Sequence, residues 1–223
     1  MRDPSKGVTL GQRFGALLHT TGRGVVALAQ THKRTPIDVA IETYRESQNG
    51  SNGYFWGGPS YVIDHDGTQH QLAPDNILTA HAGGGNREAY LSGHWTAKCS
   101  GATLTAWRKA WPTYQHPYSL FPSTSPNHDY VGIEMIPIGC GFGGSPMRPG
   151  LLFTKEQHES AAELAKDIAM RWGFPAGWAQ TSRLLGHEDV DILNRMDSMG
   201  GWDPGWLRGQ PYFDFAFVRG RIG

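Results

Sequence analysis

The chain has 223 residues, 39% of them apolar and 18% charged, which suffices for one folded domain with a hydrophobic core. Its 20 basic and 20 acidic residues cancel, so the charge balance gives no indication of a nucleic-acid or anionic-membrane partner. No run of 18 apolar residues occurs, and residues 1–15 lack the apolar region of a signal peptide. We therefore expect no membrane insertion and no Sec-dependent export, with the chain cytoplasmic at synthesis.

Ten histidines are unusual in a chain of neutral balance, and they direct attention to metal or acid–base chemistry. The two cysteines, Cys99 and Cys140, have no CxxC spacing. They form either one disulfide or two buried thiols, and the sequence leaves both alternatives open.

The first two predicted elements are a buried strand and an amphipathic helix. Residues 14–22 are a short apolar run ended by Thr-Thr-Gly, which predicts a strand with His19 at its C-terminal edge. Thr35 and Pro36 are typical of a helix start, as N-cap and first helical residue. The predicted helix carries its apolar face on Ile37, Ile41 and Tyr44 and ends at Asn49-Gly50.

A glycine-rich aromatic loop, residues 50–60, precedes a predicted hairpin over Tyr61–Leu72. Asp66-Gly67 between two alternating runs predicts a two-residue type I′ turn. That register places His65 and His70 as diagonal neighbours, for which sheet packing or solvation is favoured over a metal pair. The face they share would consist of Tyr61, Ile63, His65, His70 and Leu72.

The middle of the chain gives weaker signals. The glycine loop of residues 81–86, HAGGGN, has neither a phosphate-loop lysine nor a GxGxxG spacing, so nucleotide binding is disfavoured. Residues 87–127 indicate a surface insertion with a short helix over Leu104–Trp111, ended by Pro112.

The second half begins with a predicted buried strand, Val131–Pro137, in which Glu134 is the only charge. Thr154 then starts a helix with a capping box, and Gly173 ends it. A short strand is predicted at residues 184–186, directly before His187. A last, aromatic helix is predicted from Pro211. Alternating strands and helices predict an α/β fold, a single domain over residues 1–223 with a central mixed sheet flanked by helices.

Three polar residues could form a hydrolytic zinc site, which uses three protein ligands and leaves one position to water. His187 and Asp203 lie in one segment, His19 ends the first strand, and Glu134 is the candidate base. Each also has a structural interpretation. A histidine at a strand end is commonly a hydrogen-bonded loop residue, Asp203 before Pro204 suits an N-cap, and Glu134 could pair with Arg183.

Six segments in order carry a family resemblance: LLHTTG, YVIDHDGTQHQL, HAGGGN, VGIE, LLGHEDV and WDPG. Together they resemble the zinc-dependent N-acetylmuramoyl-L-alanine amidases of the type-2 group, to which phage lysozyme-type amidases and peptidoglycan recognition proteins are related. The match extends from about residue 14 to about residue 206. It implies a zinc site at the sheet edge, in a groove that binds peptidoglycan.

The resemblance also implies residue roles. The ligands of Zn²⁺ would be His19, His187 and Asp203, the catalytic glutamate would be Glu134, and His81 and Asn86 would line the groove. Among the aromatic residues Tyr54, Phe55 and Trp56, the last is our candidate for contacting sugar or peptide. We expect a monomer that acts on peptidoglycan or a muropeptide, and that reaches the cell wall, if it does so, by a phage-type or other non-Sec route, as a bacteriolytic endolysin does.

One departure from the family pattern bears on activity. The subgroup with an aspartate ligand carries a lysine two residues before it, and here that position is Gly201. Arg195 is the only cation between His187 and Asp203 and is our candidate to stabilise the oxyanion instead. Two alternatives stay open: a recognition module that binds peptidoglycan without cleaving it, and a cytoplasmic amidase that recycles anhydro-muropeptides.

Overall fold

A five-stranded mixed sheet with the order β4-β3-β6-β1-β7 forms the centre of the molecule. The computed structural model describes residues 9–20, 33–47, 56–82, 126–138, 153–190, 204 and 213–223. Strands β3, β6, β1 and β7 are parallel and β4 is antiparallel, which confirms the predicted mixed sheet of an α/β domain. The strand bounds are β1 Gly15–Thr20, β3 Tyr61–Ile63, β4 Gln69–Gln71, β6 Tyr130–Met135 and β7 Leu184–Gly186.

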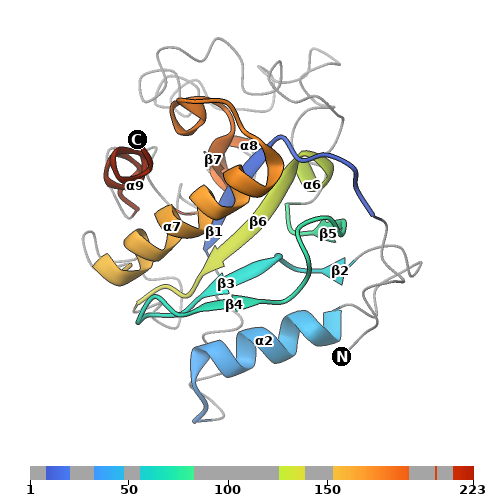
Figure 1. The fold of residues 1–223 in the computed structure, drawn as a ribbon. Coiled ribbons are helices and arrows are strands. Elements are labelled where there is room, and N and C mark those ends of the chain that lie inside the picture. The colour runs from blue at the N-terminus through green and yellow to red at the C-terminus, as the bar shows by residue number, and fades with distance from the viewer. Residues whose placement is uncertain are drawn as a thin grey trace, which may run out of the picture.

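Helices cover both faces of this sheet (Figure 1). One face packs its apolar side chains, among them Leu18 and Ile133, against α7 and α9. The other face packs Val62 and Ile136 against α2. A strand that is covered on both faces needs apolar side chains on each of them, which explains the runs 16–18 in β1 and 130–133 in β6. The helices are α2 Pro36–Ser47, α6 Pro126–Asp129, α7 Lys155–Trp172, α8 His187–Val190, α9 Phe215–Ile222 and the 3₁₀ helix η3 Trp178–Gln180.

The predicted helix starts are confirmed for α2 and α7 and wrong for α9. The Thr35 hydroxyl accepts from the Asp38 N–H at 3.3 Å, and Thr154 forms a complete capping box with Gln157. Helix α9 begins at Phe215, because the Asp214 carboxylate accepts from the Phe217 N–H at 2.9 Å and serves as the cap. Pro211 lies outside the described residues.

The hairpin of β3 and β4 forms, but its predicted register is wrong by one residue. Val62 lies opposite His70, and the Asp64 N–H donates to the Thr68 carbonyl, so three residues form the loop. Gly67 has a φ of 84°, the left-handed conformation that ends such a three-residue loop. His70 therefore shares the face of Val62, and it does not lie with Tyr61 as the two-residue turn predicted.

Two short strands form a second, two-stranded sheet. Residues 50–60 were expected to be loop, but Trp56–Gly57 (β2) pairs in parallel with Thr79–Ala80 (β5). The predicted helix Leu104–Trp111, the helix end at Asn49-Gly50 and both cysteines lie outside the described residues. No helix in the described ranges has the length and apolar character needed to cross a membrane.

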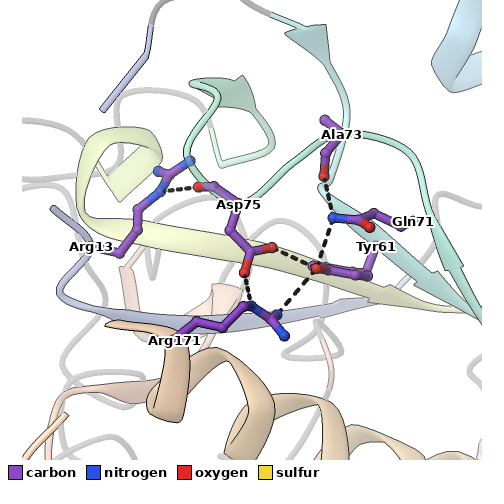
Figure 2. Close-up of polar contacts among 6 residues, drawn as sticks. All are labelled: Arg13, Tyr61, Gln71, Ala73, Asp75 and Arg171. Carbon is purple, nitrogen blue, oxygen red and sulfur yellow. Dashed lines mark hydrogen bonds and ion pairs between the residues drawn. The ribbon is translucent and has the colours of Figure 1, made fainter. Parts of the chain in front are cut away.

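A polar network fixes the N-terminal ends of the strands (Figure 2). The buried Asp75 carboxylate accepts from the Tyr61 hydroxyl at 2.6 Å and from Arg171 Nε at 2.7 Å, which ties β3 to the last turn of α7. Burial, and then the hydrogen bond to Asp75, raise the pKa of Tyr61, so its hydroxyl stays protonated and able to donate. Arg13 Nε donates to the Asp75 carbonyl at 2.7 Å and joins the segment before β1 to the same network.

His158 joins α9 to α7 through both of its ring nitrogens. Its Nδ1 donates to the Thr154 carbonyl at 2.6 Å, and its Nε2 accepts from the Asp214 N–H at 3.0 Å. The ring stacks on Phe213 at 4.6 Å, and burial lowers the pKa of His158 below its ordinary value. The neutral ring is thus the one the fold requires.

We expect the free energy of unfolding to fall as the pH drops below about 6.5, the pKa of histidine in an unfolded chain. A depressed folded-state pKa contributes stability above the unfolded pKa, and this is lost on acidification towards the folded-state value. Urea unfolding at pH 7.5 and 5.5 measures it, with His158→Phe as the matched variant. The variant should lose less stability on acidification than the wild type, and equal losses would contradict the prediction.

Candidate metal centre

Three adjacent strands bring His19, Glu134 and His187 to one face at one edge of the sheet. His19 lies directly opposite Glu134 in the parallel pairing of β1 and β6. On the other side Leu18 pairs with Gly186, so His187 follows β7 beside His19. Residues in parallel register share a face, and the carboxyl ends of parallel strands are where α/β proteins place their sites.

The two histidines contact each other. Their ring centroids are 4.5 Å apart at an interplanar angle of 63°, and the residues are only 2% and 3% exposed. A pair of buried imidazoles beside a carboxylate supplies the nitrogen and oxygen donors that zinc favours. The chemistry of these donors therefore fits a zinc ion held in part by His19 and His187.

The predicted third ligand, Asp203, lies outside the described residues. Within the described ranges, no group of three or more histidine, cysteine, aspartate or glutamate side chains is arranged to hold a metal ion. Pro204, which follows Asp203, is described and buried.

A short turn after β7 orients His187. The Asp189 carboxylate, 1% exposed, accepts a hydrogen bond from the Gly186 N–H at 2.8 Å. This hydrogen bond joins the last residue of β7 to α8, which begins at His187. Asp189 therefore fixes the direction in which the chain leaves β7, and with it the position of His187.

Glu134 is held by a tyrosine, which the sequence did not indicate. The Tyr44 hydroxyl of α2 donates to Glu134 Oε2. The alternative pairing with Arg183 is wrong, because Arg183 Nη1 donates to the Phe14 carbonyl at 2.7 Å and its guanidinium lies over the Phe14 ring. The sequence predicts Tyr44 only as part of the apolar face of its helix. A buried tyrosine hydroxyl needs a hydrogen-bond partner, and this could have indicated the contact.

His81 is buried under the site, with both ring nitrogens in hydrogen bonds. Its Nδ1 lies 3.0 Å from His19 Nε2, and its Nε2 lies 3.1 Å from the Tyr130 carbonyl. The family resemblance implies that His81 lines the substrate groove, which stays a prediction. Burial, and then the charge of Arg13, lower the pKa of His81 to about 3, so the ring is neutral at physiological pH.

The glycine of the VGIE segment makes room for this ring. A Cβ at Gly132 would lie 2.5 Å from Cγ of His81, well inside van der Waals contact. The backbone N–H groups of His81 and Ala82 both donate to Asn127 Oδ1 at 2.9 Å. The position of the His81 ring is thus fixed by the strand beneath it and by Asn127.

Other predicted site residues stay predictions. Trp56 belongs to β2, but its side chain lies outside the described residues. Backbone and side chain of three further residues lie outside the described ranges: Asn86, Arg195 and Gly201.

A family model and a solved structure are similar to this chain. The N-acetylmuramoyl-L-alanine amidase family matches residues 17–206, which include every predicted site residue. The structure is similar to that of AmpD, solved as a selenomethionine derivative, with a TM-score of 0.52 and 15% sequence identity, over 100% of this chain and 97% of that one. At that identity the likeness shows the fold alone. No curated protein matches in sequence. On the family match, the chain belongs to the N-acetylmuramoyl-L-alanine amidases, hydrolases of an amide in peptidoglycan-type substrates.

Proposed function

We propose that the chain cleaves the amide bond between N-acetylmuramic acid and L-alanine with the help of a zinc ion held by His19, His187 and Asp203. The observation that carries the proposal is the contact between the two buried histidines, with Glu134 opposite His19 on the neighbouring strand. A zinc ion in such a site supplies Lewis acidity, which lowers the pKa of water and polarises a carbonyl.

Glu134 is the base in this proposal. A carboxylate at the sheet edge can take the proton of the attacking water and pass it to the leaving amine. Tyr44 holds Oε2 of Glu134 by its hydroxyl, which restricts the rotation of the carboxylate. Strand β1 holds His19 and the turn after β7 holds His187, which favours a site that is arranged before substrate arrives.

The remaining roles rest on residues outside the described ranges. Arg195 replaces the family lysine as the cation that stabilises the tetrahedral oxyanion, since Gly201 cannot do so. Asn86 and Trp56 contact the substrate, and the protein works as a monomer. We propose that the protein reaches the cell wall by a phage-type or other non-Sec route. For that setting we expect cleavage of intact sacculi in preference to soluble anhydro-muropeptides, and the opposite preference would favour the recycling amidase.

Metal analysis of the purified protein tests the zinc site without any substrate. The wild type should hold about one equivalent of zinc. His19→Ala and Asp203→Ala should each lose it, because a site with three protein ligands keeps only two when one is removed. His158→Phe is the matched control, a histidine on α7, which covers the opposite face of the sheet. Equal zinc content in all four proteins would overturn the assignment of ligands.

The second candidate function, a peptidoglycan-binding module without activity, is favoured by one observation, the glycine at position 201. Digestion of purified sacculi separates the two functions. The enzyme should release stem peptides with a new L-alanine N-terminus, and a chelator should stop the release. Firm binding to sacculi with no released peptide would decide for the binding module.

A further inference from the structure

We propose that His81 is a positioning residue that fixes the tautomer of His19 and so leaves His19 Nδ1 as the atom that binds zinc. The proposal rests on the zinc site proposed above and assigns a new role within it. It concerns a side chain that has both ring nitrogens in protein hydrogen bonds.

The Tyr130 carbonyl determines which ring nitrogen of His81 carries the proton. A peptide carbonyl only accepts hydrogen bonds, so His81 Nε2, 3.1 Å away, has to carry the proton of that bond. The same carbonyl also accepts from Arg13 Nη1 at 3.0 Å. Tyr130 O therefore acts as a fixed acceptor at the base of the site.

The tautomer of His81 in turn determines which ring nitrogen of His19 carries the proton. A neutral imidazole carries one N–H, so with Nε2 protonated His81 offers a lone pair at Nδ1. His19 Nε2, 3.0 Å from that lone pair, has to be the donor of the bond. With its proton on Nε2, His19 keeps the lone pair of Nδ1 for a metal ion.

The surroundings of His81 hold its ring in place. Gly132 lies against the ring, and a Cβ there would be 2.5 Å from Cγ of His81. Asn127 Oδ1 binds the backbone N–H of His81 and that of Ala82. Ligand histidines are usually oriented by a carboxylate or a carbonyl at the second nitrogen, and here a second histidine passes on the orientation set by the Tyr130 carbonyl.

The experiment has two readouts besides activity. In the metal-free protein, long-range proton–nitrogen NMR of labelled histidines should show His19 as the Nε2–H tautomer, with its signals assigned by their loss in His19→Ala. Competition with a chromophoric chelator should show that His81→Leu weakens zinc binding about 10- to 100-fold, the usual effect of losing such a partner.

Two polar variants separate the hydrogen bond from packing. Asparagine at position 81 can place its oxygen near the site of Nδ1, so His81→Asn should keep part of the affinity. Glutamine reaches towards the Nε2 site and the Tyr130 carbonyl, so His81→Gln should lose as much affinity as His81→Leu. Circular dichroism checks that each variant is folded. If a variant is unfolded, the tautomer of His19 in the wild-type protein still tests the proposal.

An Nδ1–H tautomer of His19, or an unchanged dissociation constant in folded His81→Leu, would overturn the role of His81 alone. A wild type that binds no zinc would overturn the proposed function as well. The two failures are therefore distinguishable, because the first occurs in a protein that still holds its metal.

Discussion

Glu134→Gln should lower kcat for amide cleavage by about 10²- to 10⁴-fold, the usual contribution of a general base. Glutamine keeps the size of the side chain and an oxygen that can accept from the Tyr44 hydroxyl, so the local structure is retained. What it lacks is the ability to take a proton from water. Release of stem peptide from purified sacculi, measured under saturating substrate, gives the rate.

The controls for this variant are zinc content and stability. Both should equal those of the wild type, since Glu134 is the base and no zinc ligand in the proposed site. Glu163→Gln is the matched change on the exposed side of α7 and should leave kcat as it is. Full activity in Glu134→Gln would remove Glu134 from the mechanism, and loss of zinc would indicate that it binds the metal.

Arg13→Met should lower the free energy of unfolding by about 3–5 kcal/mol, the range for removing one partner of a buried charged network. The Arg13 residue is 1% exposed, and burial lowers the pKa of its guanidinium to about 10, so it is charged at neutral pH. It donates to five backbone carbonyls. They belong to Asp75, Ile77, Asn127, His128 and Tyr130.

Methionine fills similar space but donates nothing, so these carbonyls lose a common donor away from water. Urea denaturation measures the effect, and Arg13→Lys should recover only part of it because an ammonium cannot reproduce the fork of the guanidinium. Arg34→Met, at an exposed ion pair with Glu42, should change stability by less than about 1 kcal/mol. A loss in Arg13→Met no larger than in Arg34→Met would show that the network is not needed for stability.

Local chemistry explains which parts of the fold could be predicted. The runs of β1 and β6 are apolar because both faces are covered, and Thr35 and Thr154 are helix caps whose effect extends over a few residues. The hairpin shows the limit of such signals. Asp66-Gly67 indicated that the chain turns, but the loop length depends on which backbone groups pair, and the pairing of Asp64 with Thr68 was not visible in the composition.

The sequence by itself indicated candidate ligands and a candidate base, since His19 and His187 each follow a short apolar run and Glu134 is the only charge inside a third. It did not determine what holds them. Tyr44 binds Glu134 across 90 positions, and His81 binds His19 across 62, because the order of the strands and the packing of α2 bring them together. Contacts of this kind depend on sheet register and on the space left by Gly132, which only the tertiary structure decides.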